Sequence, residues 1–580
     1  MVPSLTRGRR CDVGLILIAI VVGVVDSTDN GHECWVIREK ILALVFLTTA
    51  TAHFTCNHMA QVFLLIVPEH YWCPLVVSNG NGSFEDSSGV GNDTLYVRQS
   101  CLLEFGSGTS DRNGTTTDYC EGGWYYEYND LYPTMSTENN WVCGDAWKQY
   151  VLHTTFWIGS MSGYVTSGFL ADKFGRKVAI CVLATISALA NLIPLFINQH
   201  LGLAIARLVA GMGAESVCST IFVLVMEFTI PERRTLIGFV WAFSWTLMAS
   251  AYPWYADLIQ SWRGLVITNS ALSAVILVLL WFVPESPSWH LTAGRRDKAV
   301  AILTKIARVN GLRDISEDDF KALQIKMTVT TSSGKKRSFL KDTLALVATP
   351  RLRRNTLVLF AGWFLICLCY NANTLELSHL GLNVYGTYSI AIAFELPVNL
   401  FTIMALDRLG RRWPNVAFMF VGGAVSLVMA LIRTDSAGAT LAMAVITIVC
   451  YAGGYNITYQ LASEIFPTEI RGRGVLLKRL FGDIGSCLGA DVAYLVEYDR
   501  YLPVLVLGAL SLLASVLLFF VPDTVHEPLP QTIEDGENFA KNQGLCFCPI
   551  LVERISPDEP KANGKQDAEE DKPGHITSHL

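Results

Sequence analysis

The hydrophobic positions of this chain fall into long runs of about twenty residues that are separated by polar segments. A run of that length crosses the roughly 30 Å hydrocarbon layer of a bilayer as one helix. The pattern predicts two sets of six such helices, at 43–66, 149–171, 178–198, 202–226, 235–256, 264–284, 355–375, 385–406, 415–433, 438–460, 474–496 and 501–521. We therefore expect an all-α, polytopic membrane protein.

A further apolar stretch, residues 12–26, precedes the first predicted helix and follows Arg7, Arg9 and Arg10. It is too short to cross a bilayer comfortably. It fits a signal-peptide-like segment, an interfacial segment or an incorrectly assigned start of the chain, and we favour the last. We set residues 1–40 apart as an atypical N-terminal segment.

The composition excludes two other classes of protein. Of the 580 residues, 51% are hydrophobic and 16% are charged, which is far from the composition of a disordered chain. The net charge of -7 offers no general basic surface for nucleic acid. The location of the charges is more informative than their sum.

Charge divides the polar segments into two sides of the membrane. Residues 68–148 contain twelve Asp or Glu and three Lys or Arg, whereas residues 292–354 contain fifteen Lys or Arg. The positive-inside rule places the first segment outside and the second in the cytosol, and an even number of spans places both termini in the cytosol. The expected parts are thus a six-helix half at 41–291, a cytosolic linker with amphipathic helices, a six-helix half at 355–521 and a largely disordered cytosolic tail at 522–580.

The outer segment also carries features of an exported polypeptide. It contains three glycosylation sequons, at Asn81, Asn92 and Asn113. It also contains four cysteines that can form disulfides in an oxidising compartment: Cys73, Cys101, Cys120 and Cys143. Four cysteines permit three pairings, and the sequence does not select one of them.

Three short motifs recur in the two predicted halves. The loop after the second span reads DKFGRK at 172–177, and the loop after the eighth reads DRLGRR at 407–412, 235 residues later. The other two pairs keep nearly the same offset: EFTIPERR at 227–234 with EIFPTEIR at 464–471, and FVPE at 282–285 with FVPD at 520–523. Three motif pairs in register indicate duplicated six-helix halves.

The loop motifs have a physical interpretation. Glycine permits a tight turn, and an Asp at a helix end pairs with cations or with a neighbouring helix N-terminus. Positive-inside anchoring explains the Arg and Lys but not the repeated Asp and Gly, so we expect a latch between the two bundles that stabilises the outward-facing state. The predicted latch and gate residues are Asp172, Gly175, Arg176, Glu227, Arg234, Asp407, Gly410, Arg411, Glu464 and Arg471.

The repeated loop motif resembles the signature of the major facilitator superfamily, which implies twelve helices in two six-helix repeats. The large outer segment with its sequons, PESPSW at 284–289 and EIFPTEIR resemble the organic cation, anion and carnitine transporter family, over about residues 40–535. Residues 494–503 and 211–227 look most like its carnitine and zwitterion branch. Two features depart from the family: Ser288 stands where arginine is usual, and the first forty residues do not match its usual cytosolic start.

Ionisable residues inside a span usually face a cavity or a partner. Asp483, in FGDIG of the eleventh span, can attract a quaternary or protonated amine, unless Lys478 or Arg479 neutralises it. The resemblance favours substrate contact, because cation carriers of the family have Asp-Ile-Gly here whereas anion and carnitine carriers have Arg-Leu-Gly. Glu215 is a second candidate, for ligand binding or proton coupling, with an ion pair to Arg207 as its structural alternative.

Aromatic and amide side chains supply further candidates. Trp363 and Tyr370 share one face of the seventh span and can enclose a cation, and the resembled family places an aromatic pair at this spacing. We expect Glu395 to form an interhelix hydrogen bond, and His53 and His58 to be packing residues. The other cavity-lining candidates are Asn57, Tyr455, Asn456 and Gln460.

No catalytic motif is present, so we expect no enzyme activity, cofactor or metal. Cys546 and Cys548 fit acylation better than metal binding. The C-terminal residues 577–580, TSHL, offer a weak match to a ligand of a PDZ domain.

We interpret the chain as a plasma-membrane carrier of small organic cations or zwitterions that works by rocker-switch alternating access. Asp483 attracts the ammonium group, and Trp363 and Tyr370 enclose it. The membrane potential supplies about 2.3 kcal/mol per charge per 100 mV, so uptake needs no coupled ion, and sodium or proton coupling stays open. Two alternatives remain: an anion carrier of the same fold that uses Lys478 and Arg479, and a non-transporting receptor that binds through its outer segment.

Overall fold

The computed structural model describes a helical protein with one small strand pair. The described residues are 33–68, 70–72, 124–128, 131–229, 234–309, 343–380, 382–433, 436–525, 527, 529–541 and 543–544. Strands β1 (Tyr71–Trp72) and β2 (Tyr125–Tyr126) pair antiparallel. The predictions for the segment 12–26, the three sequons, the C-terminal residues and Cys73, Cys101, Cys120, Cys546 and Cys548 lie outside the described residues.

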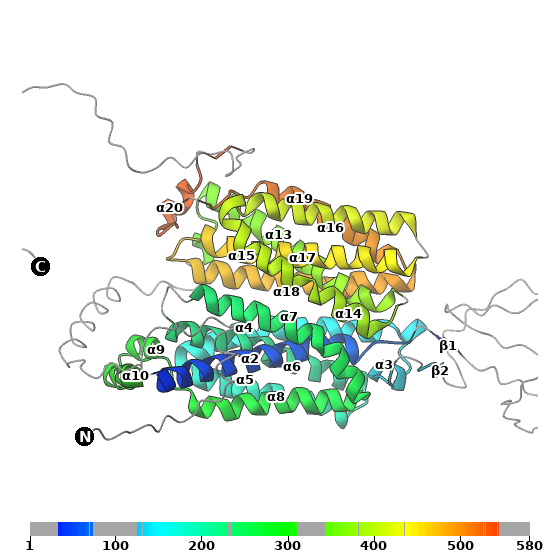
Figure 1. Ribbon diagram of the computed structural model, residues 1–580, viewed down its shortest axis with the longest axis horizontal. Helices are drawn as coiled ribbons and strands as arrows, with labels where there is room; N and C mark the ends of the chain where they lie inside the picture. Colours follow the sequence, from blue (N-terminus) through cyan, green and yellow to red (C-terminus); the bar gives the residue numbers. More distant parts are fainter. Residues whose placement is uncertain are drawn as a thin grey trace, which may run out of the picture.

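The first half consists of six long helices that lie side by side in one layer (Figure 1). They are α2 (Glu33–Phe63), α4 (Trp147–Phe174), α5 (Arg176–Leu192), α6 (His200–Phe228), α7 (Arg234–Ile259) and α8 (Trp262–Phe282). The short helices α3 (Met135–Glu138) and η1 (Cys143–Asp145) precede α4, η2 (Ile193–Leu195) follows α5, and α9 (Pro287–Thr292) and α10 (Arg296–Val309) follow α8.

The second half forms the other layer (Figure 1). It consists of α13 (Pro350–Glu376), η4 (Leu377–His379), α14 (Val384–Ala393), α15 (Glu395–Leu409), α16 (Arg412–Ile432), α17 (Ala437–Ile465), α18 (Arg471–Tyr494), η5 (Leu495–Glu497) and α19 (Leu502–Phe519). The short helix α20 (Ile533–Asn538) lies in the tail. Each predicted span thus coincides with a helix, except that the eighth span is divided into α14 and α15.

Proline explains the division of the eighth span. Pro397 has no amide N–H, so the carbonyl of Ala393 lacks its helical partner, and Ala393 is the last residue of α14. Glu395 begins the next helix, α15. The break therefore lies beside a buried acidic side chain in the middle of the span.

Eight helices in the described part of the chain are long and apolar enough to cross a membrane. The helices that coincide with the other four predicted spans are α2, α4, α7 and α18. In α18 the apolar pattern is interrupted by Lys478, Arg479 and Asp483. Low hydropathy in these spans reflects polar side chains that the fold buries.

The packing repeats between the halves, as the sequence motifs predict. In the first half α5 packs against α8 and α2 against α7, and in the second α16 packs against α19 and α13 against α18. Close approach depends on small residues in places: a Cβ at Gly159 of α4 would lie 1.9 Å from the carbonyl oxygen of Leu208 in α6.

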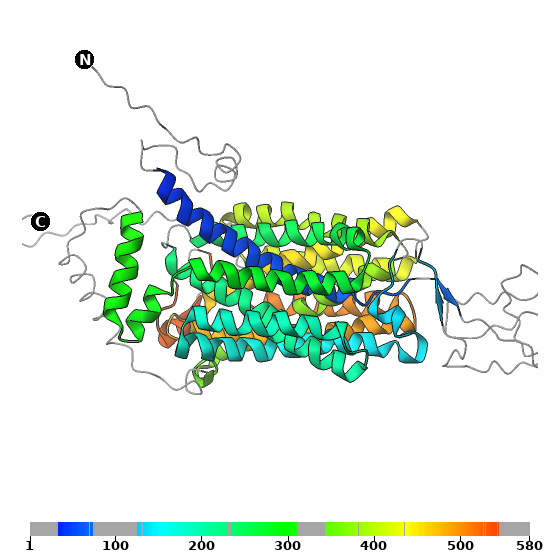
Figure 2. The same cartoon turned by 90° about the horizontal axis from the view of Figure 1, so that it is seen from below.

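The two halves meet mainly through α4 with α18 and through α7 with α14. Tyr150 contacts Tyr494 with ring centroids 5.2 Å apart, and Phe63 contacts Tyr388 at 5.4 Å. Phe63 is the last residue of α2 and Tyr150 lies in the first turn of α4, next to α3 in the chain. Helix α3 and strands β1 and β2 lie at one end of the molecule, whereas α9, α10 and α20 lie at the opposite end (Figures 1 and 2). The halves therefore contact each other closely at the end of the strand pair.

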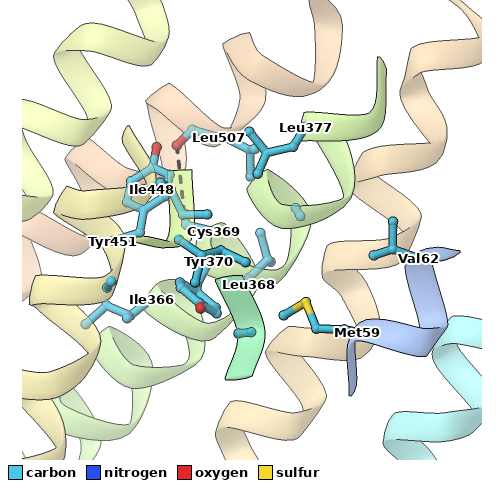
Figure 3. Close-up of a cluster of buried hydrophobic side chains, with 14 of the residues drawn as sticks. Met59, Val62, Ile366, Leu368, Cys369, Tyr370, Leu377, Ile448, Tyr451 and Leu507 are labelled. Carbon is cyan, nitrogen blue, oxygen red and sulfur yellow. Dashed lines mark hydrogen bonds between the residues drawn. The ribbon is translucent and has the colours of Figure 1, made fainter. Parts of the chain in front are cut away.

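A hydrophobic core extends across both halves. Figure 3 shows part of it, in which Met59 and Val62 of α2 belong to the same cluster as Leu368 and Tyr370 of α13. Burial of such side chains away from water stabilises the contact between the layers.

The tail contacts the second half through α20. The Glu537 carboxylate accepts hydrogen bonds from the backbone N–H groups of Arg351 (3.0 Å) and Leu352 (3.0 Å) at the start of α13. Desolvation raises the pKa of Glu537, but these hydrogen bonds and the nearby Arg351 charge outweigh it, so that the pKa lies below its usual value. Part of the tail is thus attached to the helical bundle.

Candidate functional site

Two buried carboxylates from the two halves lie at the centre of the interface. Asp483 of α18 is 2% exposed and Glu215 of α6 is 1% exposed. The Ser160 hydroxyl of α4 lies 3.1 Å from Asp483 Oδ2 and 3.1 Å from Glu215 Oε2. One hydroxyl therefore joins the two acids across the halves.

Arg479 is shared by these carboxylates. Its Nε lies 3.2 Å from Asp483 Oδ1, and its Nη2 contacts Glu215 Oε2. Tyr164 donates a hydrogen bond of 2.6 Å to the same Glu215 oxygen, and Arg479 Nη1 donates one of 2.8 Å to the Tyr455 hydroxyl. The guanidinium is thus bound by groups from α6, α17 and its own helix, and it lies 5.2 Å from the centre of the Tyr164 ring of α4.

The structure shows which basic residues pair with Asp483 and Glu215, a question that the sequence left open. Arg479 does pair with Asp483, but it pairs with Glu215 at the same time, so one cation faces two carboxylates. Arg207 does not provide the counter-charge of Glu215 seen here; its guanidinium lies 5.0 Å from the centre of the Phe156 ring. With both acids ionised, this group carries one excess negative charge in a low-dielectric interior.

Aromatic rings from α13 and α17 adjoin the cluster. Trp363 and Tyr455 lie with ring centroids 4.5 Å apart, and Tyr370 and Tyr455 lie 5.8 Å apart. The Tyr370 hydroxyl donates a hydrogen bond of 3.0 Å to Glu395, which is the interhelix bond expected for that acid. Tyr370 is therefore oriented by Glu395, and Tyr455 lies between it and Trp363 in this arrangement.

The remaining candidates lie in hydrogen-bond networks. Asn456 donates to Asn399 (2.6 Å), and Asn399 donates to Thr246 of α7 (3.2 Å), so this chain of amides also crosses the halves. Gln460 donates to Glu464 (3.1 Å). Asn57 accepts a hydrogen bond of 2.9 Å from Asn191 and is buried within the first half. Their contact with a substrate stays a prediction.

The three repeated motifs come together in each half. In the first half, Gly175 adopts φ 106° and ψ 161°, where the chain turns from α4 into α5. The Arg176 Nη2 lies 3.1 Å from Glu227, and the Glu285 carboxylate accepts hydrogen bonds from the backbone N–H groups of Arg176 (2.9 Å) and Lys177 (3.1 Å). Glu285 thereby caps the N-terminus of α5.

The second half repeats this geometry with different residues. Gly410 adopts φ 81° and ψ 177° between α15 and α16. The Arg411 Nε lies 3.3 Å from Glu464, and the Asp523 carboxylate accepts hydrogen bonds of 3.2 Å from the backbone N–H groups of Arg411 and Arg412. In each half the three motifs contact one another, which explains why the three motif pairs are separated by nearly the same number of residues.

The ion pairs described for these motifs lie within each half. Asp172 pairs with Arg176 of the same half (3.6 Å), and Arg471 donates hydrogen bonds to Phe466 O and Thr468 Oγ1 of the second half, both 3.1 Å. The side chains of Arg234 and Asp407 lie outside the described residues. A latch between the bundles stays a prediction for another conformation.

We expect Gly175→Ala to lower the stability of the protein by about 1–3 kcal/mol, because the backbone region of Gly175 is essentially restricted to glycine. An added Cβ would also lie 2.4 Å from the Glu285 carboxylate. Gly168→Ala is the matched control, since Gly168 lies in α4, the helix that ends at this turn, and a Cβ there meets nothing within 4 Å. Thermal unfolding in detergent measures both, and equal melting temperatures for the two variants would contradict this account of the turn.

Sequence reasoning missed several members of the site. Ser160 and Tyr164 were not singled out, although their spacing of four places them on one face of the second span. Glu285 and Asp523 were recognised as part of a repeat but received no role. An acid after a span, repeated in register with a loop motif in both halves, is the signal that predicts such a cap.

Of the four outer cysteines, only Cys143 lies in the described part of the chain. It is disulfide-bonded, and its partner lies outside the described residues. The choice among the three pairings therefore stays open.

Known proteins resemble this chain in sequence over most of its length. A family model described as "Sugar (and other) transporter" matches residues 119–532. "Organic cation transporter 1" of Caenorhabditis elegans is 30% identical over 425 residues, which cover 73% of this chain and 72% of that protein. "Solute carrier family 22 member 2" of Homo sapiens is 26% identical over 540 residues, which cover 89% of this chain and 95% of that protein.

Solved structures resemble it in fold. The xylose transporter XylE from E. coli in an inward-open conformation matches with a TM-score of 0.52 and 16% identity, covering 90% of this chain and 99% of that chain. Its partially occluded inward-open conformation matches with a TM-score of 0.52 and 14% identity, covering 83% of this chain and 96% of that chain. At this identity the likeness shows the arrangement of helices.

Proposed function

This chain belongs to the sugar (and other) transporter family of the major facilitator superfamily, and from this premise we propose that it carries small organic cations across the plasma membrane. The predicted superfamily and fold are confirmed, and the chain is a multi-pass membrane transporter. Its relatives are transporters rather than enzymes, which agrees with the predicted absence of catalytic activity and disfavours a receptor.

The main observation that supports the proposal is that Arg479 pairs with two carboxylates at once. Glu215 and Asp483 both face this one guanidinium, so this group of three residues has one more carboxylate than cation, and Lys478 lies apart from it against Trp363 and Tyr459. A monovalent cation neutralises that excess, whereas an anion increases it. The alternative of an anion carrier that uses Lys478 and Arg479 is disfavoured at Arg479, because carboxylates already occupy that side chain, and it then depends on Lys478.

The names of the relatives support the same substrate class. Organic cation transporter 1 of Caenorhabditis elegans is identical to this chain at 30% of the residues in the matched region. Carnitine-like zwitterions carry the same quaternary ammonium group as simple organic cations, so the proposal includes them. The inside-negative potential is worth about 2.3 kcal/mol per charge per 100 mV, and uptake of a cation therefore needs neither sodium nor a proton.

We propose rocker-switch alternating access, in which the two halves tilt about the central site. In the proposed topology both termini, the linker and the tail face the cytosol, and the strand pair faces outside, which fits the opposite positions of α10 and β1 (Figure 2). Close contacts of Tyr150 with Tyr494 and of Phe63 with Tyr388 then close the outer end, as in an inward-facing state. Outward opening separates Glu215 from Arg479.

Uptake of labelled tetraethylammonium and labelled carnitine into cells that express the chain tests this function. We expect saturable, sodium-independent uptake of tetraethylammonium that falls when the membrane is depolarised with external potassium. Cells that express no transporter are the control. Uptake of an organic anion without uptake of either cation, at confirmed surface expression, would contradict the proposal, and sodium-dependent carnitine uptake alone would restrict it to zwitterions.

A further inference from the structure

Lys478 lies beside the central cluster in an unusual setting. Its side chain is fully buried, and its ammonium nitrogen lies 3.7 Å from the centre of the Trp363 ring and 4.2 Å from that of Tyr459. Gly482, one turn along α18, makes this arrangement possible, because a Cβ there would lie 2.2 Å from the Trp363 indole nitrogen. The absence of a side chain at Gly482 lets the indole lie against α18.

The ammonium of Lys478 has no hydrogen-bond acceptor among the described residues. The adjacent Arg479 contrasts with it, since Arg479 contacts Glu215, Asp483 and the Tyr455 hydroxyl. A primary ammonium is compact and strongly hydrated, so its burial without an acceptor is costly. Attraction to the aromatic faces compensates only part of that cost.

An aromatic pair of this kind suits a different cation better. Quaternary ammonium groups carry an apolar shell and are commonly recognised by aromatic faces. They have no N–H group that loses a hydrogen bond on leaving water. The site between Trp363 and Tyr459 is therefore filled by a primary ammonium. A quaternary ammonium suits two aromatic faces better than that head group does.

We propose that Lys478 is a tethered competitor for the aromatic site, and that a transported quaternary ammonium displaces it from Trp363 and Tyr459. Lys478 then lowers the affinity of this site for every cation, and the aromatic faces of Trp363 and Tyr459 determine which cation is preferred. A primary amine offers the same head group as Lys478 and gains little by replacing it, whereas a quaternary ammonium gains the aromatic contact. The inference rests on the proposed transport of organic cations and adds a preference for quaternary over primary ammonium substrates.

Equilibrium binding to the purified full-length protein tests this role. We expect Lys478→Met to tighten the dissociation constant of labelled tetraethylammonium by about tenfold, because the aromatic site no longer holds its own cation. A labelled primary alkylamine of similar size has to displace the same side chain, so it gains no more than the quaternary ion, and the preference of the aromatic pair for the quaternary ion does not decrease. Lys478→Arg keeps a cation in the site and is expected to retain the wild-type constants.

Arg473→Met is the matched control, because it removes a positive charge from the same helix, α18, outside the aromatic pair. We expect it to leave both constants unchanged. Lys478→Gln serves as a second neutral variant if the Met variant does not fold. Unchanged or weaker binding of tetraethylammonium by the neutral variants would overturn the inference. A wild-type protein that neither binds nor takes up tetraethylammonium would instead overturn the proposed function.

Discussion

Replacing Arg479 by glutamine is expected to destabilise the protein by about 3–5 kcal/mol, the range observed when one partner of a buried ion pair is removed. The substitution leaves Glu215 and Asp483 in the interior with no compensating cation between them. Both carboxylates lie within 3.1 Å of the Ser160 hydroxyl, so their mutual repulsion adds to the loss. A lower melting temperature in detergent and a smaller amount of protein at the cell surface measure the effect.

The double variant Arg479→Gln with Glu215→Gln separates this account from a general packing defect. It removes one acid together with the guanidinium, and the new amide still accepts a hydrogen bond from Tyr164. We therefore expect it to be more stable than the single variant. Arg473→Gln, on the same helix, is the control for charge removal. A double variant that is less stable than Arg479→Gln would show that the pairing across the halves contributes little.

Replacing Asp483 by asparagine is expected to reduce uptake of tetraethylammonium by about two to three orders of magnitude. A cation about 4 Å from a carboxylate gains about 4 kcal/mol at an effective dielectric constant of 20, and asparagine removes that gain. The asparagine side chain still accepts a hydrogen bond from Ser160, so the local packing is preserved. Initial uptake rates, normalised to surface expression, measure the effect.

The selectivity of the Asp483 effect distinguishes it from a loss of folding. Uptake of an organic anion, if present at all, should be unchanged or improved in Asp483→Asn. Asp491→Asn is the matched control, because it neutralises an acid two turns further along α18. Equal losses of cation uptake in the two variants would indicate a structural role for negative charge in this helix, and would remove Asp483 from the substrate site.

The repeat explains why the contacts of the loop motifs are symmetric and those of the central charged cluster are not. Arg176, Glu227 and Glu285 have close equivalents in Arg411, Glu464 and Asp523, which make the same contacts in the other half. At the 237-residue offset between Glu227 and Glu464, the equivalents of Lys478, Arg479 and Asp483 in the first half are Trp241, Ala242 and Thr246. The three charged residues of the eleventh span thus have no charged equivalents in the fifth span.

The sequence predicted the parts of the fold that depend on local composition. Each span predicted from hydropathy coincides with helix in the described part of the chain, but hydropathy did not predict the end of α14 at Ala393, which follows from the missing amide of Pro397. Asp483 was recognised because a charge inside an apolar run is costly wherever it lies. The approximate positions of the helices, and the charged residues inside them, can therefore be predicted from one sequence.

Contacts between distant segments were not predictable in the same way. Helical periodicity gives the face on which Asp483 and Tyr370 lie, but not the helix that this face meets. Ser160, which contacts Asp483, is 323 residues away in the chain. The hydrogen bond from Tyr370 to Glu395 and the position of Tyr459 beside the ammonium of Lys478 were likewise not predictable, and the contact of Tyr370 with a substrate stays a prediction.

The sign of the current evoked by tetraethylammonium tests the central claim most directly. Under voltage clamp, a carrier whose buried acids attract a cation moves net positive charge inward with its substrate. We predict a saturable inward current that grows at more negative potentials and is lost in Asp483→Asn. The account would be contradicted by no current from tetraethylammonium at confirmed surface expression, or by an outward current that an organic anion evokes instead.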